Sequence, residues 1–586
     1  MRGKSNSILP IIDSIKGYDR STFRFDLIAG ITVATVAIPQ GMAYSLLAGM
    51  PAQYGLYALL LPLLVYAIFA TSNRLSVGPV AVSAILILSG ISAIAAPLSP
   101  EYIGLVIATG LLIGIFQCLL GFFRLGFIIN FLSHPVIAGF TSAAAVIIIV
   151  SQIQYILGIT VPHFEQLYDT VAFCVQNCGS TNIYNLVLAT SSLLIIIVGK
   201  KINKNIPGAL LTVVLGIASV YFLKLEDRGV EILGTIPTGL PSFYVIDLDL
   251  AQIRLLLPTV LTVSLIGIVE SLGIAKALEA KHRDHVIRPN QELIALGLSK
   301  IVGSFSQAIP SSGSFSRSAI NNESGAKTNL ASIYTFLIIL LVLIFLTPVF
   351  YYLPKAVLAG IILSSVIGLF DVAEAKHLWK IHRPDFFMML TTFITTLAIG
   401  IELGVLTGVI LSVLTILYRT SKPNFTELGK IEESNRFMDL ERFAEAEKMP
   451  EFIILRFEDR LYFANTGVFK DRILQAIEEP GVKYVLLVGS LINDIDSSGI
   501  SALNEIDQHL KNNGIELHLC GAIGTLRDQL YKAHLLGEND KHHVSINDAM
   551  KSINKSADEK NDMHAMQTNL KRKKDHSSTS SKDPTK

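Results

Sequence analysis

One arginine of this chain lies where a charged side chain is costly. Arg317 falls within residues 304–332, SFSQAIPSSGSFSRSAINNESGAKTNLAS, a polar, glycine-containing segment flanked by long apolar runs. An intramembrane guanidinium is expensive and is therefore a functional candidate, and a fixed cation predicts an anion site. The alternatives are a structural cation paired with a carboxylate and a side chain that reaches the membrane interface.

The second charge of this kind is Glu270, in the middle of the run TVLTVSLIGIVESLGIAKAL. A carboxylate at membrane depth requires a partner or a proton. If Glu270 pairs with Arg317 in the empty site, its protonation would free the arginine for an anion, which predicts proton coupling. Two alternatives stay open: a permanent salt bridge that only locks the helices, and pairing of Arg317 with Glu323.

Broken helices are expected to position these groups, because irregular backbone at membrane depth must line protein or a water-filled cavity. A helix beginning near 314–316 directs free N–H groups and the positive end of its dipole at the site. The segment 76–84, SVGPVAVSA, predicts a second such helix, since Pro79 suits a first turn. Gln40 and Tyr44 share one helix face and would add an amide and a hydroxyl, unless they serve only helix packing.

The composition places most of the chain in lipid. Of its 586 residues 51% are hydrophobic and only 16% are charged, and the mean hydropathy is +0.52. Soluble domains contain about 25% charged residues. The net charge of +1 argues against a nucleic-acid partner. Without a metal cluster, phosphate loop or nucleophile elbow, we expect no metal, no other cofactor and no enzyme activity.

About fourteen apolar segments follow one another along residues 26–420. They are expected at 26–47, 52–70, 77–96, 103–123, 134–158, 184–200, 207–224, 256–278, 291–309, 314–322, 328–347, 349–370, 384–400 and 402–420. Lys and Arg gather in the N-terminal segment and in alternate loops, so both termini are predicted to be cytoplasmic. The broken segments recur in both halves, and seven spans per half predict two repeats that are inverted in the membrane. We expect a multi-pass protein of the plasma membrane, or of the inner membrane in a bacterium.

The segment pattern divides the chain into five parts. They are a cytoplasmic segment 1–25, a transmembrane domain 26–420, a polar linker 421–450, a soluble α/β domain 451–555 and a disordered tail 556–586. The basic run 571–574 in the tail is expected to be solvated, with anionic lipid as the weaker alternative. Cys174 and Cys178 lie in a predicted external loop, where a disulfide and two free thiols are both open.

In the soluble part, strands and helices alternate, which predicts a sheet with helices packed on it. Strands are expected at 452–457, 461–465, 483–490 and 515–522, and helices at 466–478, 498–512 and 524–535. Asp496, or one of the two serines after it, is expected to cap the middle helix.

Several separate motifs together resemble one family. The stretch DLIAGITVATVAIPQGMAYSLLAGMPAQYGLYA at 26–58 closely resembles the first-helix signature of the sulfate permease (SulP) anion transporters, and SGSFSRSAINNESGAKTNLAS resembles their second half-helix. The stretches RFEDRLYFANTGVF and DIDSSGISAL resemble a STAS domain. The resemblance spans about residues 10–555. It implies an α-helical membrane transporter with a 7+7 inverted repeat, followed by a cytoplasmic α/β STAS domain.

The same resemblance implies a core domain that moves like an elevator against a gate domain, with the anion bound between the third and tenth half-helices. It also implies a homodimer. The matching binding positions are Gln40, Tyr44, Val80, Phe315, Ser316 and Arg317. Glu270 takes the acidic position of the eighth helix, as in proton-linked sulfate carriers. Ser498 aligns with a serine that is phosphorylated in anti-sigma antagonists, which implies possible regulation through a partner of the STAS domain.

These observations predict a proton-coupled symporter of sulfate or a similar oxyanion, in contact with membrane lipid. A dianion that arrives with protons loses less to an inside-negative potential, at about 2.3 kcal/mol per charge per 100 mV. Bicarbonate or dicarboxylate transport or exchange is the alternative within the class. An alternative of another class is a membrane-anchored signalling protein whose output is the STAS domain, for which loss of Arg317 would leave function intact.

Overall fold

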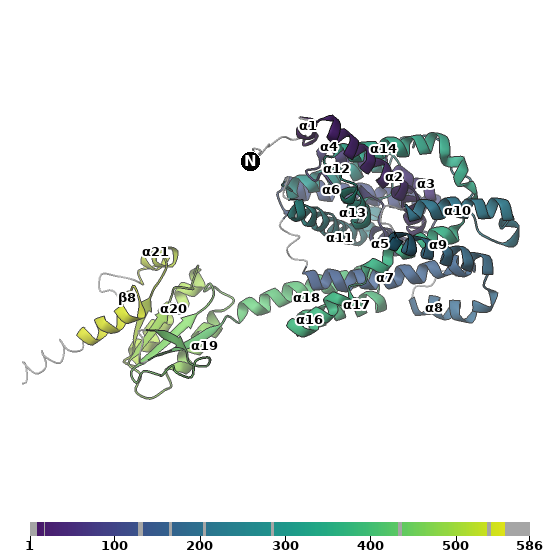
Figure 1. Ribbon diagram of the computed structural model, residues 1–586. Helices are drawn as coiled ribbons and strands as arrows, with labels where there is room; N and C mark the ends of the chain where they lie inside the picture. The colour runs from purple at the N-terminus through teal and green to yellow at the C-terminus, as the bar shows by residue number, and fades with distance from the viewer. Residues whose placement is uncertain are drawn as a thin grey trace, which may run out of the picture. The chain divides into compact units, whose positions relative to one another are not determined.

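The computed structural model describes residues 9–16, 18–126, 133–162, 167–202, 207–282, 286–431, 436–535 and 541–556. The chain forms two compact units, Met1–Val413 and Leu414–Lys586, which we call unit 1 and unit 2 and describe separately. Figure 1 labels most of their helices and strand β8.

Every apolar segment predicted between residues 26 and 420 contains a helix (Figure 1). In the first half these are α2 (Arg20–Leu47), α3 (Ala52–Tyr57) with α4 (Leu61–Phe69), α5 (Ala81–Ser92), α6 (Pro100–Phe122), α7 (His134–Leu157), α9 (Ile183–Ile202) and α10 (Gly208–Leu223). In the second half they are α11 (Leu250–His282), α12 (Pro289–Phe305), α13 (Phe315–Glu323), α14 (Leu330–Leu341), α15 (Lys355–Val366), α17 (Arg383–Ala398) and α18 (Ile401–Ser421). Within the described ranges, 9 helical stretches are long and apolar enough to cross a membrane, as expected for a multi-pass protein.

In the described part of unit 1, three further α-helices lie outside the predicted segments. The short helix α1 (Ile11–Ile15) precedes α2. Helix α8 (Leu167–Gln176) occupies the predicted external loop and contains Cys174, which is buried, whereas Cys178 is exposed; both are free thiols. Helix α16 (Val372–Ile381) begins at the capping side chain of Asp371, which accepts a hydrogen bond from the N–H of Glu374 at 2.9 Å.

Two fully buried carboxylates join the two halves of unit 1. Glu292 on α12 accepts hydrogen bonds from the N–H groups of Thr71 at 2.6 Å and Ser72 at 2.7 Å, between α4 and α5. Asp26 on α2 accepts a hydrogen bond from the N–H of Lys327, just before α14, at 2.7 Å. A buried carboxylate is tolerated when it accepts several hydrogen bonds, and here it also satisfies loop N–H groups that have no helical partner.

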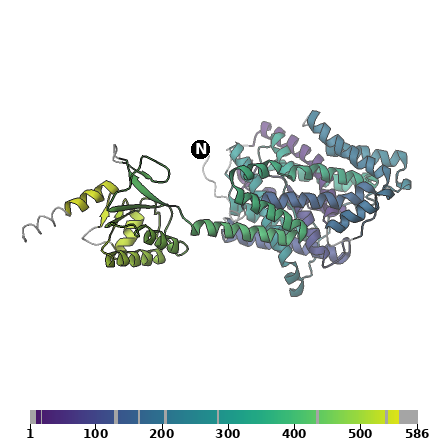
Figure 2. The same cartoon turned by 90° about the horizontal axis from the view of Figure 1, so that it is seen from below.

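Unit 2 is an α/β domain built on a six-stranded sheet with the order β4-β3-β5-β6-β7-β8. The strands are β3 (Phe425–Lys430), β4 (Phe437–Asp439), β5 (Phe452–Phe457), β6 (Tyr484–Val488), β7 (Glu516–Cys520) and β8 (His542–His543). Strands β5 to β8 run parallel, and β3 and β4 are antiparallel additions. Figure 2 shows this sheet with its helices.

The two faces of the sheet are covered by different helices. On one face, α19 (Thr466–Ala476), α20 (Ser497–Asn512) and α21 (Gly524–Lys532) pack on the alternate apolar residues of the central strands. On the other face, a helix over 546–556 contributes Ala549 and Ile553. Burial on both faces explains why the central strands read as continuous apolar runs.

Two expectations for unit 2 need correction. Strands β3 and β4 lie in the range predicted as a polar linker, because their half-buried residues carry little apolar pattern. The predicted strand at 461–465 is a turn, because Asn465 accepts a hydrogen bond from the N–H of Tyr462 and donates one to the carbonyl of Arg460. Asp496 does cap α20, since its side chain accepts from the N–H of Gly499 at 2.8 Å. Residues 557–586, which include the basic run 571–574, lie outside the described residues.

A buried histidine pair predicts that the β7–β8 edge is sensitive to acid. The Nδ1 of His518 lies 3.0 Å from the Nε2 of His543, and burial together with the neighbouring His543 lowers the pKa of His518 to about 4. The folded state therefore binds fewer protons than the unfolded state, whose histidine pKa is about 6.5. We expect amide-exchange protection of residues 541–556 to be full above about pH 6.5 and to fall towards about pH 4. His518→Leu is expected to flatten this dependence, and an equally steep loss in that variant would contradict the prediction.

Candidate anion-binding site

Two short strands bring the predicted broken segments together. Strand β1 (Val77–Gly78) pairs in antiparallel fashion with β2 (Ser312–Gly313), so that Val77 lies opposite Gly313 and Gly78 opposite Ser312. Helix α5 follows β1 and helix α13 follows β2, each within three residues. Because the strands are antiparallel, α5 and α13 leave the crossing in opposite directions. The N-terminus of each helix therefore lies at the crossing.

Serine residues fix this crossing. The N–H of Ser314 donates to the carbonyl of Ser76 at 2.9 Å, and the N–H of Ser76 donates to the hydroxyl of Ser318 at 2.9 Å. The Ser314 hydroxyl also caps α13 by accepting from the N–H of Arg317 at 3.4 Å. The serine-rich sequence therefore supplies partners for backbone groups that a broken helix leaves free at membrane depth.

The guanidinium of Arg317 is fully buried at this crossing. Its Nη1 donates to the carbonyl of Pro79 at 2.9 Å and to the Oε1 of Gln40 at 3.3 Å. Its Nε and Nη2 are buried and have no hydrogen-bond partner among the described residues. These two nitrogens lie on one edge of the planar group, and that edge matches two oxygens of an oxyanion or a carboxylate. The site therefore holds a fixed cation with one bidentate donor edge unused.

Gly78 makes room for this guanidinium, which predicts that Gly78→Ala weakens anion binding. A Cβ at this position would lie 3.0 Å from Nη2 of Arg317 and 2.5 Å from Cδ2 of Leu59. Even a small displacement of a positioned group can cost tenfold or more, so we expect a roughly tenfold rise in the KM of transport. Gly273→Ala on α11 is the matched control, because a Cβ there meets no atom within 4 Å. An unchanged KM in Gly78→Ala would contradict this role.

Within the described residues, Arg317 forms an ion pair with neither carboxylate that the sequence offered. Glu323 is exposed at the far end of α13. The Oε2 of Glu270 is buried without a hydrogen-bond partner. The hydroxyl of the next residue, Ser271, accepts from the N–H of Gly313 at 2.8 Å, so this turn of α11 touches β2. Glu270 is therefore the carboxylate placed beside the crossing.

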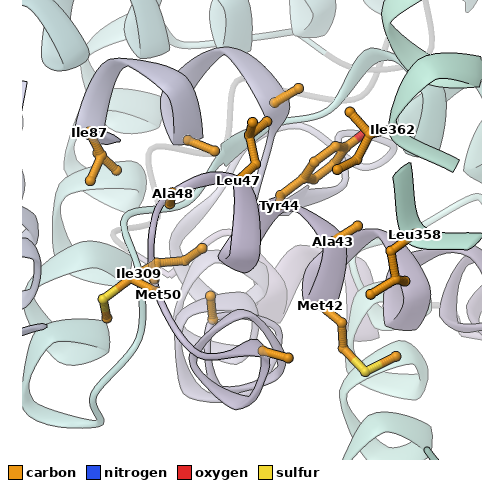
Figure 3. Packing of buried hydrophobic residues seen from close by; sticks show 14 of the residues in the cluster. Met42, Ala43, Tyr44, Leu47, Ala48, Met50, Ile87, Ile309, Leu358 and Ile362 are labelled. Carbon is orange, nitrogen blue, oxygen red and sulfur yellow. The ribbon is translucent and has the colours of Figure 1, made fainter. Parts of the chain in front are cut away.

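The other predicted binding residues fall into a buried and an exposed group. Tyr44 is buried one turn after Gln40 on α2, and its ring points toward Ile362 of α15 (Figure 3). Val80 is buried as the residue that precedes α5. Ser316 and Phe315 are exposed in the first turn of α13, and 70% of the surface of Phe315 is accessible. The start of α13 is thus open while its arginine is enclosed.

A buried cation of α12 was also missed from the sequence. Lys300 lies in the run QELIALGLSKIVGSF, within α12, and is buried. Its Nζ donates to the Oε1 of Gln117 on α6 at 3.0 Å. A lysine in an apolar run was the available signal, but a partner 183 residues away in the sequence could not be inferred.

Ser498 belongs to unit 2. It is half-buried in the first turn of α20, directly after the capping residue Asp496 and Ser497. Its phosphorylation remains a prediction.

Comparisons with known proteins agree with this architecture. The model of the sulfate permease family matches residues 23–392, and the STAS domain model matches residues 443–549. The chain is 37% identical to Sulfate transporter 4.1, chloroplastic, of Arabidopsis thaliana, over 87% of this chain and 77% of that protein. It is 32% identical to Sulfate transporter 1.1 of the same organism, over 92% and 87% respectively.

Two solved structures show the same fold at lower sequence identity. The murine anion transporter Slc26a9 in its inward-facing state has a TM-score of 0.86 at 24% identity, covering 94% of this chain and 96% of that chain. The transmembrane domain of the cyanobacterium bicarbonate transporter BicA has a TM-score of 0.58 at 22% identity, covering 68% of this chain and 98% of that chain.

The family match and the relatives, together with the apolar helices, define a multi-pass membrane transporter of anions that carries a C-terminal STAS domain and is not an enzyme. The chain belongs to the sulfate permease family.

Proposed function

We propose that this chain is a proton-coupled symporter of sulfate or a closely similar oxyanion. The observation that carries the proposal is the edge of Arg317 formed by Nε and Nη2, which is buried and has no partner in the part of the chain that the structure describes. The edge lies at the start of α13, where helix N–H groups and the helix dipole also favour negative charge. The two Arabidopsis thaliana relatives are named as sulfate transporters, which supports sulfate as the first candidate substrate.

Glu270 is proposed as the proton-carrying group. Its Oε2 is buried without a hydrogen-bond partner in the described ranges, and its neighbour Ser271 contacts β2. A protonated Glu270 would leave the charge of Arg317 to the anion, and an ionised Glu270 would compensate that charge in the empty site. The proton would also offset part of the electrical work of moving a dianion inward, about 2.3 kcal/mol per charge per 100 mV.

Transport is proposed to occur by an elevator-type movement of the helices around the β1–β2 crossing. Hydrogen bonds among β1, β2, α11 and α13 support their movement as one body. The cation-rich alternate loops support cytoplasmic termini in a plasma-membrane protein.

Bicarbonate or a dicarboxylate is the second candidate substrate. The free edge of Arg317 donates two parallel hydrogen bonds, and a carboxylate accepts these as well as a sulfate does. The site's chemistry therefore favours an oxyanion class, within which the substrate has to be measured.

Uptake by proteoliposomes tests the proposal. The purified chain should accumulate labelled sulfate when the outside is acidic, and accumulation should fall when the pH gradient is removed. Bicarbonate and succinate should compete only weakly. Absent sulfate uptake, with bicarbonate or succinate accumulated instead, would replace sulfate by the second candidate, and sulfate uptake that is indifferent to the gradient would exclude proton coupling.

A further inference from the structure

The amide of Gln40 connects the arginine of the site to a helix outside the crossing. Its Oε1 accepts from Nη1 of Arg317 at 3.3 Å, and its Nε2 donates to the hydroxyl of Ser365 at 3.4 Å. Ser365 lies near the end of α15, which packs against α2, α7 and α9. It is half-buried and belongs to none of the segments that form the crossing.

The chemistry of the three groups permits only this orientation of the amide. A guanidinium has donors and no acceptor, so the carbonyl oxygen of Gln40 must face Arg317. The amide nitrogen must then face Ser365. The Ser365 hydroxyl donates its own proton to the carbonyl of Ile361 at 3.2 Å, which leaves its oxygen free to accept. Each donor therefore meets an acceptor. If the amide were rotated by 180°, its Nε2 would face Nη1 of Arg317, and two donors would lie together.

This arrangement also determines which edge of Arg317 is free. Gln40 and the carbonyl of Pro79 both hold Nη1, so Nε and Nη2 remain for a ligand. Loss of the Ser365 contact would release the Gln40 amide, and the guanidinium would lose one of the two acceptors that aim it. The anion would then have to order the side chains itself and would bind more weakly.

We propose that Ser365 is a positioning residue for anion binding, acting through Gln40 on Arg317. This inference rests on the proposed function, because it concerns the same site. It adds that anion affinity depends on contact between the crossing and α15. A movement that separates α2 from α15 would break the Gln40–Ser365 hydrogen bond and lower the affinity of the site.

Kinetics of Ser365→Ala in proteoliposomes test the inference. We expect the KM for sulfate to rise about fivefold to tenfold with the maximal rate nearly unchanged, the pattern of an interaction made equally in ground and transition states. Ser365→Thr keeps the hydroxyl and should restore the wild-type KM. Ser364→Ala is the matched control, because the Ser364 hydroxyl donates to the carbonyl of Ile361 at 2.7 Å in the same helical turn.

A double-mutant cycle separates positioning from general damage. In a Gln40→Ala background, Ser365→Ala should add no further rise in KM, because the group through which it acts is gone. Additive effects, an unchanged KM in Ser365→Ala, or a lower maximal rate with normal KM would overturn the inference. Wild-type protein that neither binds nor transports sulfate would instead overturn the proposed function, and the inference with it.

Discussion

Replacement of Arg317 by alanine is expected to reduce sulfate uptake at least about 30-fold, while the protein still folds and inserts. The variant loses the cation and the donor edge of the site, and leaves the carbonyls of Gln40 and Pro79 without their donor. Truncation of a buried, hydrogen-bonded charge costs about 2–5 kcal/mol, and about 1.4 kcal/mol corresponds to a factor of ten. Initial rates in proteoliposomes, compared at equal protein content, measure this loss.

A second substitution tests the geometry of the arginine apart from its charge. Arg317→Lys keeps a cation but has no planar pair of parallel donors, so its uptake should lie between those of the wild type and the alanine variant. Elution profile and melting temperature show whether each variant is folded. Unchanged uptake in a folded Arg317→Ala would remove the arginine from the site, and it would favour the membrane-anchored signalling protein over the transporter.

Replacement of Glu270 by glutamine is expected to abolish the dependence of uptake on external pH. Glutamine has the shape of the protonated acid but cannot exchange a proton, and the Oε2 that it replaces has no hydrogen-bond partner to lose among the residues that the structure describes. Uptake by the wild type should rise up to about tenfold per pH unit on acidification, the limit for one titrating group. The variant should transport at a rate that is nearly constant between about pH 5.5 and about pH 7.5.

Glu323→Gln provides the matched control. Glu323 is exposed at the end of α13 and forms no ion pair with Arg317 in the described part of the chain, so this variant should keep the wild-type pH profile. A flat profile in Glu323→Gln with a normal one in Glu270→Gln would exchange the roles of the two carboxylates.

Local signals in the sequence point to the segments that form the candidate site. Arg317 and Glu270 interrupt apolar runs, and the Gly, Pro and Ser residues around 76–84 and 312–320 mark broken helices. The pairing of β1 with β2 then follows from the need to satisfy irregular backbone at membrane depth. The contacts of Arg317 were not predictable, because Gln40 and Pro79 are 277 and 238 residues away in the sequence.

In unit 2, the prediction of strands from the sequence depended on how strongly each strand is buried. Strands β5, β6 and β7 are buried on both faces and are read easily from their apolar runs. Strand β3 was missed because its sequence FTELGK alternates weakly and carries two charges. The false strand at 461–465 contains aromatic residues typical of a strand, but the side chain of Asn465 binds the local backbone and imposes a turn.

The bond between Asp26 and Lys327 has a consequence for biosynthesis. Asp26 enters the membrane region with the first long helix, but its N–H donor lies 301 residues later in the chain. Gln40 and β1 are likewise synthesised before their partners, which are Arg317 and β2 respectively. During synthesis the first helices must therefore be held with unsatisfied polar groups until α13 and α14 have been inserted. Truncated chains that end before Arg317 should accordingly be recognised as immature by the quality-control machinery of the membrane.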